Sequence, residues 1–351
     1  MGKMATAQTR SSSAPRWAQF SDDKLLDLRL CDLRITLPGT VLEQRLDRLY
    51  RELAARDLKF RPHAWLSTEW FSPDGVPGIA IPFFLAHPRL MRLEESQMFE
   101  VEGRTPESCM QLLRHEAAHA LDTAFRLHRR AAWRENFGRF TDPYKPHYTP
   151  RPYSRDYVHH LEFWYAQSHP AEDYAETFSV WLGMSPAKWR AEYANWPALE
   201  KLEYVHELMA EIAGQTAPVK SAERVEPLAE ITKTLRRYYA DRQDTRQFEL
   251  PDVYDHDLHR LFGARRAGDE APETAAAFLK RHHEEIRRSV APWTGESPFV
   301  VEQVLRRVIA RLQKLRLYVA HSERQTLLEA RLFLTVQTMN YIHSGRLTRQ
   351  R

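Results

Sequence analysis

The stretch that decides the fold is residues 106–129, PESCMQLLRHEAAHALDTAFRLHR. Its apolar residues recur with a helical period, which predicts a single helix. Residues four apart on a helix project from nearly the same face, about 6 Å apart along the axis, so His115 and His119 point the same way. Their two imidazoles can bind one metal ion, and Glu116 lies beside them in the position of a general base.

The same face of this predicted helix carries an acid one turn further on. His119 and Asp122 both lie within about 40° of His115 around the helix axis, whereas Leu113 lies near the opposite side. We expect Asp122 to orient a ligand histidine through its second ring nitrogen. Since the chain has 16 histidines, the His-Glu-x-x-His pattern can also arise by chance, and it needs support from elsewhere.

A second predicted helix, over residues 170–184, supplies a carboxylate. It begins with Pro170, and Glu172 and Glu176 share one of its faces. Two glutamates four residues apart repel each other unless a cation or a proton donor satisfies them, which a bound metal would explain. The alternative for Glu172 is that an acid in the first turn is favoured by the helix dipole alone.

With these residues the chain resembles the gluzincin zinc metallopeptidases, in particular the catalytic domains of anthrax lethal factor and the Pro-Pro endopeptidases, and a zinc-binding metallopeptidase family of bacteria. Those proteins share the pattern HExxHxxD, a tyrosine seven residues before the ligand glutamate, and a second glutamate four residues after it. Tyr165, Glu172 and Glu176 stand at these spacings here. The likeness covers residues 107–213 and leaves the N-terminal 100 residues and the C-terminal part unassigned.

The resemblance implies a fold and a chemistry. The fold is α+β, a zincin-like domain with a small N-terminal sheet and an active-site helix. One Zn²⁺ per chain is expected on His115, His119 and Glu172, with Glu176 accepting from a ligand histidine. The implied activity is hydrolysis of peptide bonds, with Glu116 as general base and Tyr165 stabilising the oxyanion.

Each implied role has an alternative. Tyr165 belongs to an aromatic cluster in which any ring could simply pack in the core. His159, His160 and His169 lie nearby, but none has the spacing of a ligand. The whole site could also belong to a zinc-binding or protein-interaction module without turnover, although the intact Glu116 argues against that reading.

The remaining sequence predicts a tail over residues 1–21, a metallopeptidase domain over residues 22–214 and a helical domain over residues 222–351. Within the metallopeptidase domain we expect a strand at residues 30–35 and a helix at residues 40–56.

Two further features of this domain bear on the substrate. We expect a short hairpin over residues 61–85, with the peptide substrate lying along the edge of that sheet. Residues 141–153 are rich in proline and tyrosine, which favours a loop that acts as a lid.

The C-terminal part reads as a helical bundle, with its clearest apolar stripe at residues 299–320. Residues 281–351 carry 13 Lys or Arg against 6 Asp or Glu, a basic balance that raises nucleic acid as a partner. No groove-reading motif accompanies those charges, so we favour a solvated helix face. Residues 252–259 could form a second metal site, but a helix start with acids in its first turn explains them better.

Composition indicates the compartment in which the protein is expected. Among 351 residues there are only two cysteines, which fits a reducing compartment, and the net charge is +4 (51 − 47). No run of about 18 residues is purely apolar, and the N-terminus lacks the apolar core of a secretory signal. We therefore expect a soluble, cytoplasmic protein without membrane contact, whose partner is a peptide or protein substrate. The sequence indicates neither the substrate nor the oligomeric state.

Overall fold

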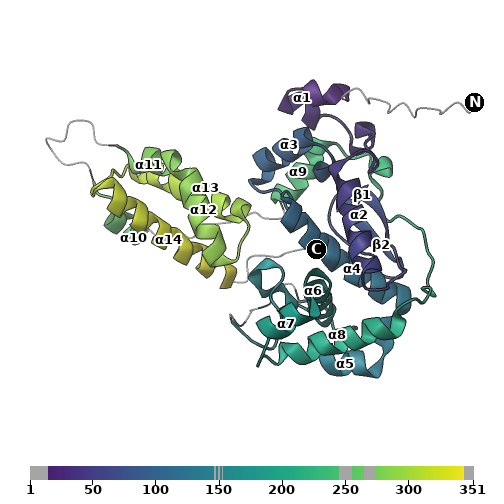
Figure 1. The fold of residues 1–351 in the computed structure, drawn as a ribbon. Helices are drawn as coiled ribbons and strands as arrows, with labels where there is room; N and C mark the ends of the chain where they lie inside the picture. Colours follow the sequence, from purple (N-terminus) through teal and green to yellow (C-terminus); the bar gives the residue numbers. More distant parts are fainter. Residues whose placement is uncertain are drawn as a thin grey trace, which may run out of the picture.

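The computed structural model describes residues 15–145, 148, 151, 153–244, 255–264 and 273–343. Figure 1 shows two bodies, a larger one formed by the N-terminal two thirds of the chain and a smaller bundle of helices. The larger body contains η1 (Arg16–Gln19), α1 (Asp22–Leu26), η2 (Leu30–Leu33), α2 (Val41–Ala54), β1 (His63–Ser67), β2 (Gly78–Pro82), η3 (Phe83–Ala86), α3 (Pro88–Met98), α4 (Pro106–Phe125), η4 (Leu127–Arg129), α5 (Ala131–Phe137), η5 (Glu162–Gln167), α6 (Pro170–Gly183), α7 (Pro186–Glu192), α8 (Ala198–Ile212), η6 (Leu228–Glu230) and α9 (Leu235–Asp244). The bundle contains α10 (Asp255–Leu261), α11 (Ala275–Arg281), α12 (His283–Thr294), α13 (Pro298–Leu315) and α14 (Glu323–His343). The predicted α+β layout is thus present in its coarse form, mostly helical with one small sheet.

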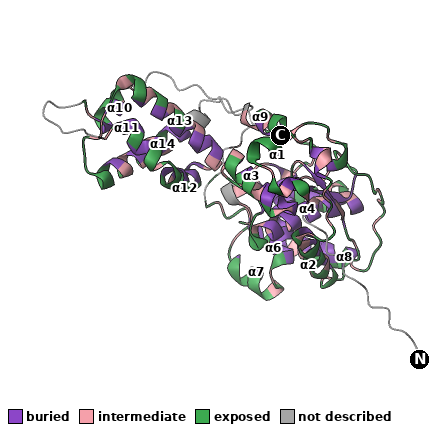
Figure 2. Ribbon diagram, turned by 90° about the horizontal axis from the view of Figure 1, so that it is seen from above, coloured by how far each residue is buried: buried purple, intermediate pink, exposed green. Residues whose placement is uncertain are grey.

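The predicted central helix is α4, and its ends follow from local chemistry. Thr105 and Ser108 form a capping box at its start, and Pro106 occupies the first turn, where no N–H is required. The helix ends at Phe125, and the next residue, Arg126, has a left-handed backbone with φ of 55°. α4 packs along α6, and both helices carry buried side chains over most of their length (Figure 2).

The small sheet differs from the predicted hairpin. Strands β1 and β2 run parallel, with His63 opposite Gly78. The antiparallel contact expected across the turn is reduced to a single bridge between Phe71 and Ala80. β1 therefore lies on one side of β2, and Phe71, in the segment that connects the two strands, pairs with the other side.

This bridge occupies one edge of the small sheet, on the side of β2 that faces away from β1. Both backbone groups of Ala80 are bonded to Phe71, and the Gly78 carbonyl accepts a hydrogen bond from the Ser72 hydroxyl. Pro82, the next residue that faces outward, has no N–H to donate. A peptide cannot add a strand on this side of β2, because the groups that would bind it are already used. Pairing of a peptide along the other edge of the sheet, at β1, stays a prediction.

The strand expected at residues 30–35 is a 3₁₀ helix, η2, over most of that range. Its backbone still pairs with a distant segment, since the Leu30 and Cys31 N–H groups donate to the Lys233 and Ile231 carbonyls. The β-propensity of these residues indicated an extended segment. In the structure only the first two amides, those of Leu30 and Cys31, pair with another segment as a strand would.

Packing also moves the predicted domain boundaries. The core of the larger body includes Trp17, which lies in the predicted tail, and Leu228, Leu235 and Tyr239, which lie in the predicted C-terminal domain. The larger body therefore extends through α9, and residues 15–20 are part of it. Residues 1–14, which make up most of the predicted tail, lie outside the described residues.

The bundle has a core of its own. Its helices bury mainly aliphatic side chains, with Val301, Val304, Leu305 and Leu312 of α13 at the centre, as the predicted stripe requires. The two bodies meet at Phe99, whose ring stacks on Phe299 at 6.3 Å.

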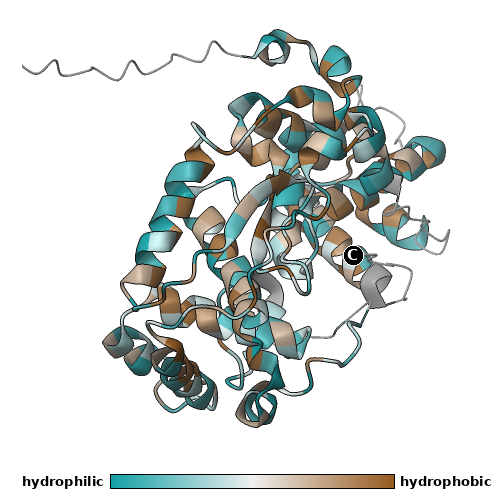
Figure 3. Cartoon of the chain, turned by 90° about the vertical axis from the view of Figure 1, so that its right-hand side faces the viewer, coloured by the Kyte–Doolittle hydropathy of each residue, from teal (hydrophilic) through white to brown (hydrophobic). Residues whose placement is uncertain are grey.

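Polar and apolar stretches alternate along the helices of both bodies (Figure 3). This is the pattern of helices that bury one face. Within the described ranges, none of the helices has the length and apolar character needed to cross a lipid bilayer.

Candidate metal centre

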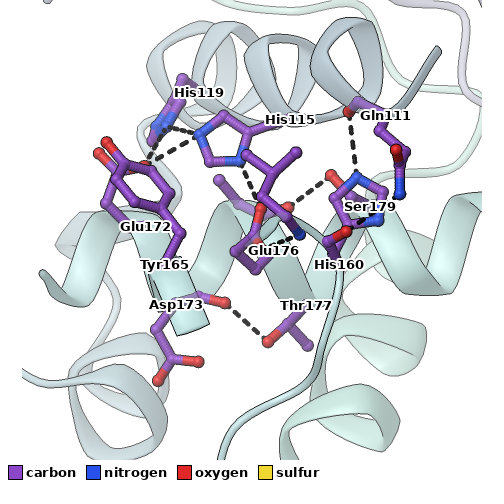
Figure 4. Close-up of polar contacts among 12 residues, drawn as sticks. Gln111, His115, His119, His160, Tyr165, Glu172, Asp173, Glu176, Thr177 and Ser179 are labelled. Atoms are coloured by element: carbon purple, nitrogen blue, oxygen red, sulfur yellow. Dashed lines mark hydrogen bonds and ion pairs between the residues drawn. The ribbon is translucent and has the colours of Figure 1, made fainter. Parts of the chain in front are cut away.

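The site lies where α4 and α6 face each other (Figure 4). α4 presents His115 and His119 one turn apart, and α6 presents Glu172 in its first turn. The start of α6 is fixed by His169, whose Nδ1 accepts a hydrogen bond from the Ala171 N–H. That cap and Pro170 determine where the helix begins, and therefore where the Glu172 carboxylate lies.

Three ligand atoms converge at this point. Nε2 of His115 lies 3.1 Å from Nε2 of His119 and 2.9 Å from Oε2 of Glu172, and the third side of the triangle is 3.4 Å. Tetrahedral ligands about 2.0–2.1 Å from a zinc ion are about 3.3 Å from one another. The three predicted metal ligands thus form a cluster whose spacing fits such an ion.

The tautomer of His115 strengthens this fit. Its Nδ1 lies 2.8 Å from Oε1 of Glu176, which is a carboxylate acceptor, so Nδ1 carries a hydrogen and donates it. In the neutral ring Nε2 then presents a lone pair to Glu172 and His119. Lone pairs that face each other at these distances repel unless a cation or a proton lies among them.

The pKa values of His115 and Glu172 also indicate that a positive charge is favoured in this cluster. Burial lowers the pKa of the His115 imidazole, but Glu172 and Glu176 raise it by more, so that this pKa lies well above its ordinary range. Burial raises the pKa of the Glu172 carboxyl, but His119 and His115 bring it well below its ordinary range. The site therefore stabilises a cation, whether this is a proton or a metal ion.

Glu116 and Tyr165 accompany the three ligands. Glu116 is next to His115 on α4 and its side chain is largely buried. The ring of Tyr165, on η5, lies 5.7 Å from the ring of His115 and belongs to the same cluster in Figure 4. Both residues predicted to be catalytic thus lie at the site, and their catalytic roles stay predictions.

Glu176 links His115, a candidate ligand, to the segment that carries Tyr165. Its second oxygen, Oε2, accepts a hydrogen bond of 2.7 Å from the Leu161 N–H, directly before η5. His160 is fixed in turn, because its ring and its carbonyl exchange two hydrogen bonds with Gln111 of α4, both 3.0 Å. The predicted contact between Glu176 and a ligand histidine is therefore present, and the same carboxylate also anchors the start of η5.

Sequence reasoning missed Tyr144. Its hydroxyl donates a 2.7 Å hydrogen bond to Oε1 of Glu172, the oxygen that does not face the histidines. The wealth of aromatic residues in the loop was the only available signal. No spacing rule connects a loop tyrosine to a ligand 28 residues later.

Asp122 does not contact a ligand histidine in the structure, contrary to prediction. Oδ1 accepts from the His128 N–H at 2.7 Å, and Oδ2 lies 2.6 Å from Nδ1 of the same residue. His128 in turn stacks on Phe140 at 4.2 Å. The acid is committed to the turn after α4, because the chain reverses there and brings His128 back to the helix face.

The other candidate residues have structural partners. His159 packs edge-on against Trp196, and His169 caps α6, so neither joins the ligand cluster. In the bundle, Asp255 pairs with Arg311, and Arg306 pairs with Glu302. Residues 252–259, which the sequence predicts as a helix start rather than a second metal site, lie partly outside the described residues. Their described part begins α10 with Asp255 and Asp257 in its first turn, and Asp255 serves an ion pair.

The geometry thus gathers two imidazoles, a carboxylate, a neighbouring glutamate and a tyrosine at one point between α4 and α6. Comparison of the chain with protein families, with curated proteins and with solved structures found no match.

Proposed function

We propose that this chain hydrolyses peptide bonds with a zinc ion held by His115, His119 and Glu172. The observation that carries the proposal is the convergence of their three ligand atoms within 4.8 Å of one another, beside Glu116 on the same helix. Two imidazoles and one carboxylate are the ligand set of several catalytic zinc sites. When bound there, zinc supplies a Lewis acid that polarises a carbonyl and acidifies a water molecule.

Glu116 is the proton carrier in this proposal. It lies one residue after His115 on α4, which is the position of the general base in the His-Glu-x-x-His pattern. It takes the proton of the attacking water and delivers it to the leaving amine, which cannot depart as an anion at neutral pH. Its burial keeps bulk water from competing for that proton.

Tyr165 is the proposed oxyanion donor. The ring contact with His115 and the anchored start of η5 hold it beside the ligands. A phenol hydroxyl donates to the oxygen that becomes negative as the carbonyl carbon turns tetrahedral. A preorganised donor of this kind contributes on the order of 100-fold in rate.

Glu176 and Glu172 contact different ring nitrogens of His115. Glu176 accepts from Nδ1 and fixes the ring from that side, and Glu172, one helical turn away on α6, faces Nε2, where the ion would lie between them. The spacing that puts both carboxylates on one face thus brings both to His115, and Glu172 also faces His119. A fixed ring keeps the nitrogen lone pair directed at the ion during turnover.

The proposal is tested by removing and restoring the metal. The wild-type chain should carry about one zinc, lose cleavage of a peptide library after chelation, and regain it when zinc is added. The variant His119→Gln should lose both zinc and cleavage, whereas His159→Gln, which alters an exposed histidine outside the cluster, should keep both. A wild-type chain that binds zinc and cleaves no peptide in the library would favour the interaction module instead.

A further inference from the structure

Tyr144 determines how Glu172 can act as a ligand. A carboxylate has two oxygens and can bind a metal through one or both. Here Oε2 faces the two histidines at 2.9 and 3.4 Å, while Oε1 accepts the 2.7 Å hydrogen bond from the Tyr144 hydroxyl. The tyrosine hydroxyl therefore donates its hydrogen bond to the oxygen that would have to bind the metal if Glu172 were a two-oxygen ligand.

Tyr144 is itself held by the start of α6. Its ring stacks on His169, with centroids 3.9 Å apart and planes within 13° of parallel. Nε2 of His169 lies 2.7 Å from the Asp142 carbonyl, and Nδ1 accepts from the Ala171 N–H. Because a carbonyl can only accept, Nε2 carries the hydrogen and the ring is fixed as one neutral tautomer.

These contacts join a surface loop to a buried ligand. Tyr144 is 55% exposed, whereas Glu172 is 5% exposed. The path from one to the other passes through a single hydrogen bond and one stacked ring. A change in the position of the loop therefore reaches the metal ligand directly.

We propose that Tyr144 is a positioning residue that restricts Glu172 to one-oxygen ligation and thereby links placement of the loop around residues 142–145 to metal affinity. This rests on the proposed zinc site. One-oxygen ligation leaves one more position open on the ion for water or a carbonyl, and the hydrogen bond keeps the Glu172 carboxylate oriented before the ion binds. Because the coupling is reciprocal, a bound ion also stabilises the loop against α6.

The test compares zinc affinities of the full chain, measured by competition with a chromophoric chelator. Tyr144→Phe should weaken zinc binding about 10-fold, the usual size for loss of an outer hydrogen bond to a metal ligand. His169→Asn keeps an acceptor for the Ala171 N–H but removes the stacked ring, and it should weaken binding in the same direction. Tyr153→Phe, at an 81% exposed tyrosine on the following stretch, is the matched control and should leave the affinity unchanged. Melting of the metal-free forms checks that all variants fold alike.

Replacing zinc by Co²⁺ gives a second measurement. Its result would be the same in wild type and Tyr144→Phe if Tyr144 only supported the fold. If Tyr144→Phe lets both Glu172 oxygens bind, the coordination number rises and the visible absorption of bound Co²⁺ weakens. Zinc affinity and cobalt spectrum identical in Tyr144→Phe and wild type would overturn the inference. A wild type that binds zinc but cleaves no peptide would overturn the proposed function alone, since the affinity comparison stands without turnover.

Discussion

Glu176 and His115 form a pair in which Oε1 of the acid lies 2.8 Å from Nδ1 of the imidazole, with the acid 1% exposed. Replacing Glu176 by Gln removes the charge that holds this ring. We expect zinc affinity to fall 10-fold or more, because a ligand histidine without its carboxylate partner is less basic and less well oriented. Glu192→Gln, an exposed acid of α7, is the control. Equal zinc affinity in Glu176→Gln and wild type would count against this role.

Tyr165→Phe separates catalysis from packing. The ring that contacts His115 is kept and only the hydroxyl is lost. We expect kcat to fall about 100-fold with zinc content and melting temperature unchanged. If kcat is unaltered, the hydroxyl takes no part in the reaction and Tyr165 is a packing residue.

Asp122→Asn should affect stability and leave the metal alone. Both carboxylate oxygens are bonded to His128, so the amide loses a charge-assisted hydrogen bond at the turn after α4. We expect the free energy of unfolding to fall by about 1–3 kcal/mol, with zinc affinity within twofold of wild type. Denaturant titration and chelator competition measure the two quantities. Loss of zinc at unchanged stability would restore the predicted contact with a ligand histidine.

Glu52 should make the stability depend on acid pH. Burial raises the pKa of its carboxyl, but the two hydrogen bonds of 2.8 Å from Arg114 and the neighbouring Arg48 lower it by more, so the folded pKa lies below 4.5. The unfolded chain then binds the proton more readily than the folded chain. The contribution is therefore complete above the unfolded pKa and is lost as the pH falls through the folded pKa.

The variant Glu52→Gln should be less stable than wild type at pH 7 by about 2 kcal/mol, and the difference should shrink in acid. Calorimetric melting over a pH series measures it. Asp47→Asn, an exposed acid on the same helix, serves as control. A difference that grows as the pH falls would contradict the sign of the shift.

What the sequence predicted well is local. The positions of His115 and His119 on α4, and of Glu172 and Glu176 on α6, follow from helical spacing, which depends only on residues close in the chain. That the two helices face each other came from the resemblance. The structure agrees at the level of the His115, His119 and Glu172 cluster.

What the sequence could not predict depends on distant or irregular segments. In the parallel pairing of His63 with Gly78, the chain returns to the start of β1 before it enters β2. The alternation of apolar residues does not encode this return. Asp122 lies on the face that helical geometry predicts, yet its partner His128 lies beyond the helix end, where that geometry no longer applies. Tyr144 reaches Glu172 from a loop without periodicity.

The most direct test of the central claim compares Glu116→Gln with wild type and with Glu107→Gln, an exposed glutamate in the first turn of the same helix. We expect about one zinc per chain in all three proteins, and cleavage of a peptide library by wild type and Glu107→Gln only. Cleavage by Glu116→Gln at the wild-type rate would contradict the role of Glu116 as general base, because another group would then have to carry the proton.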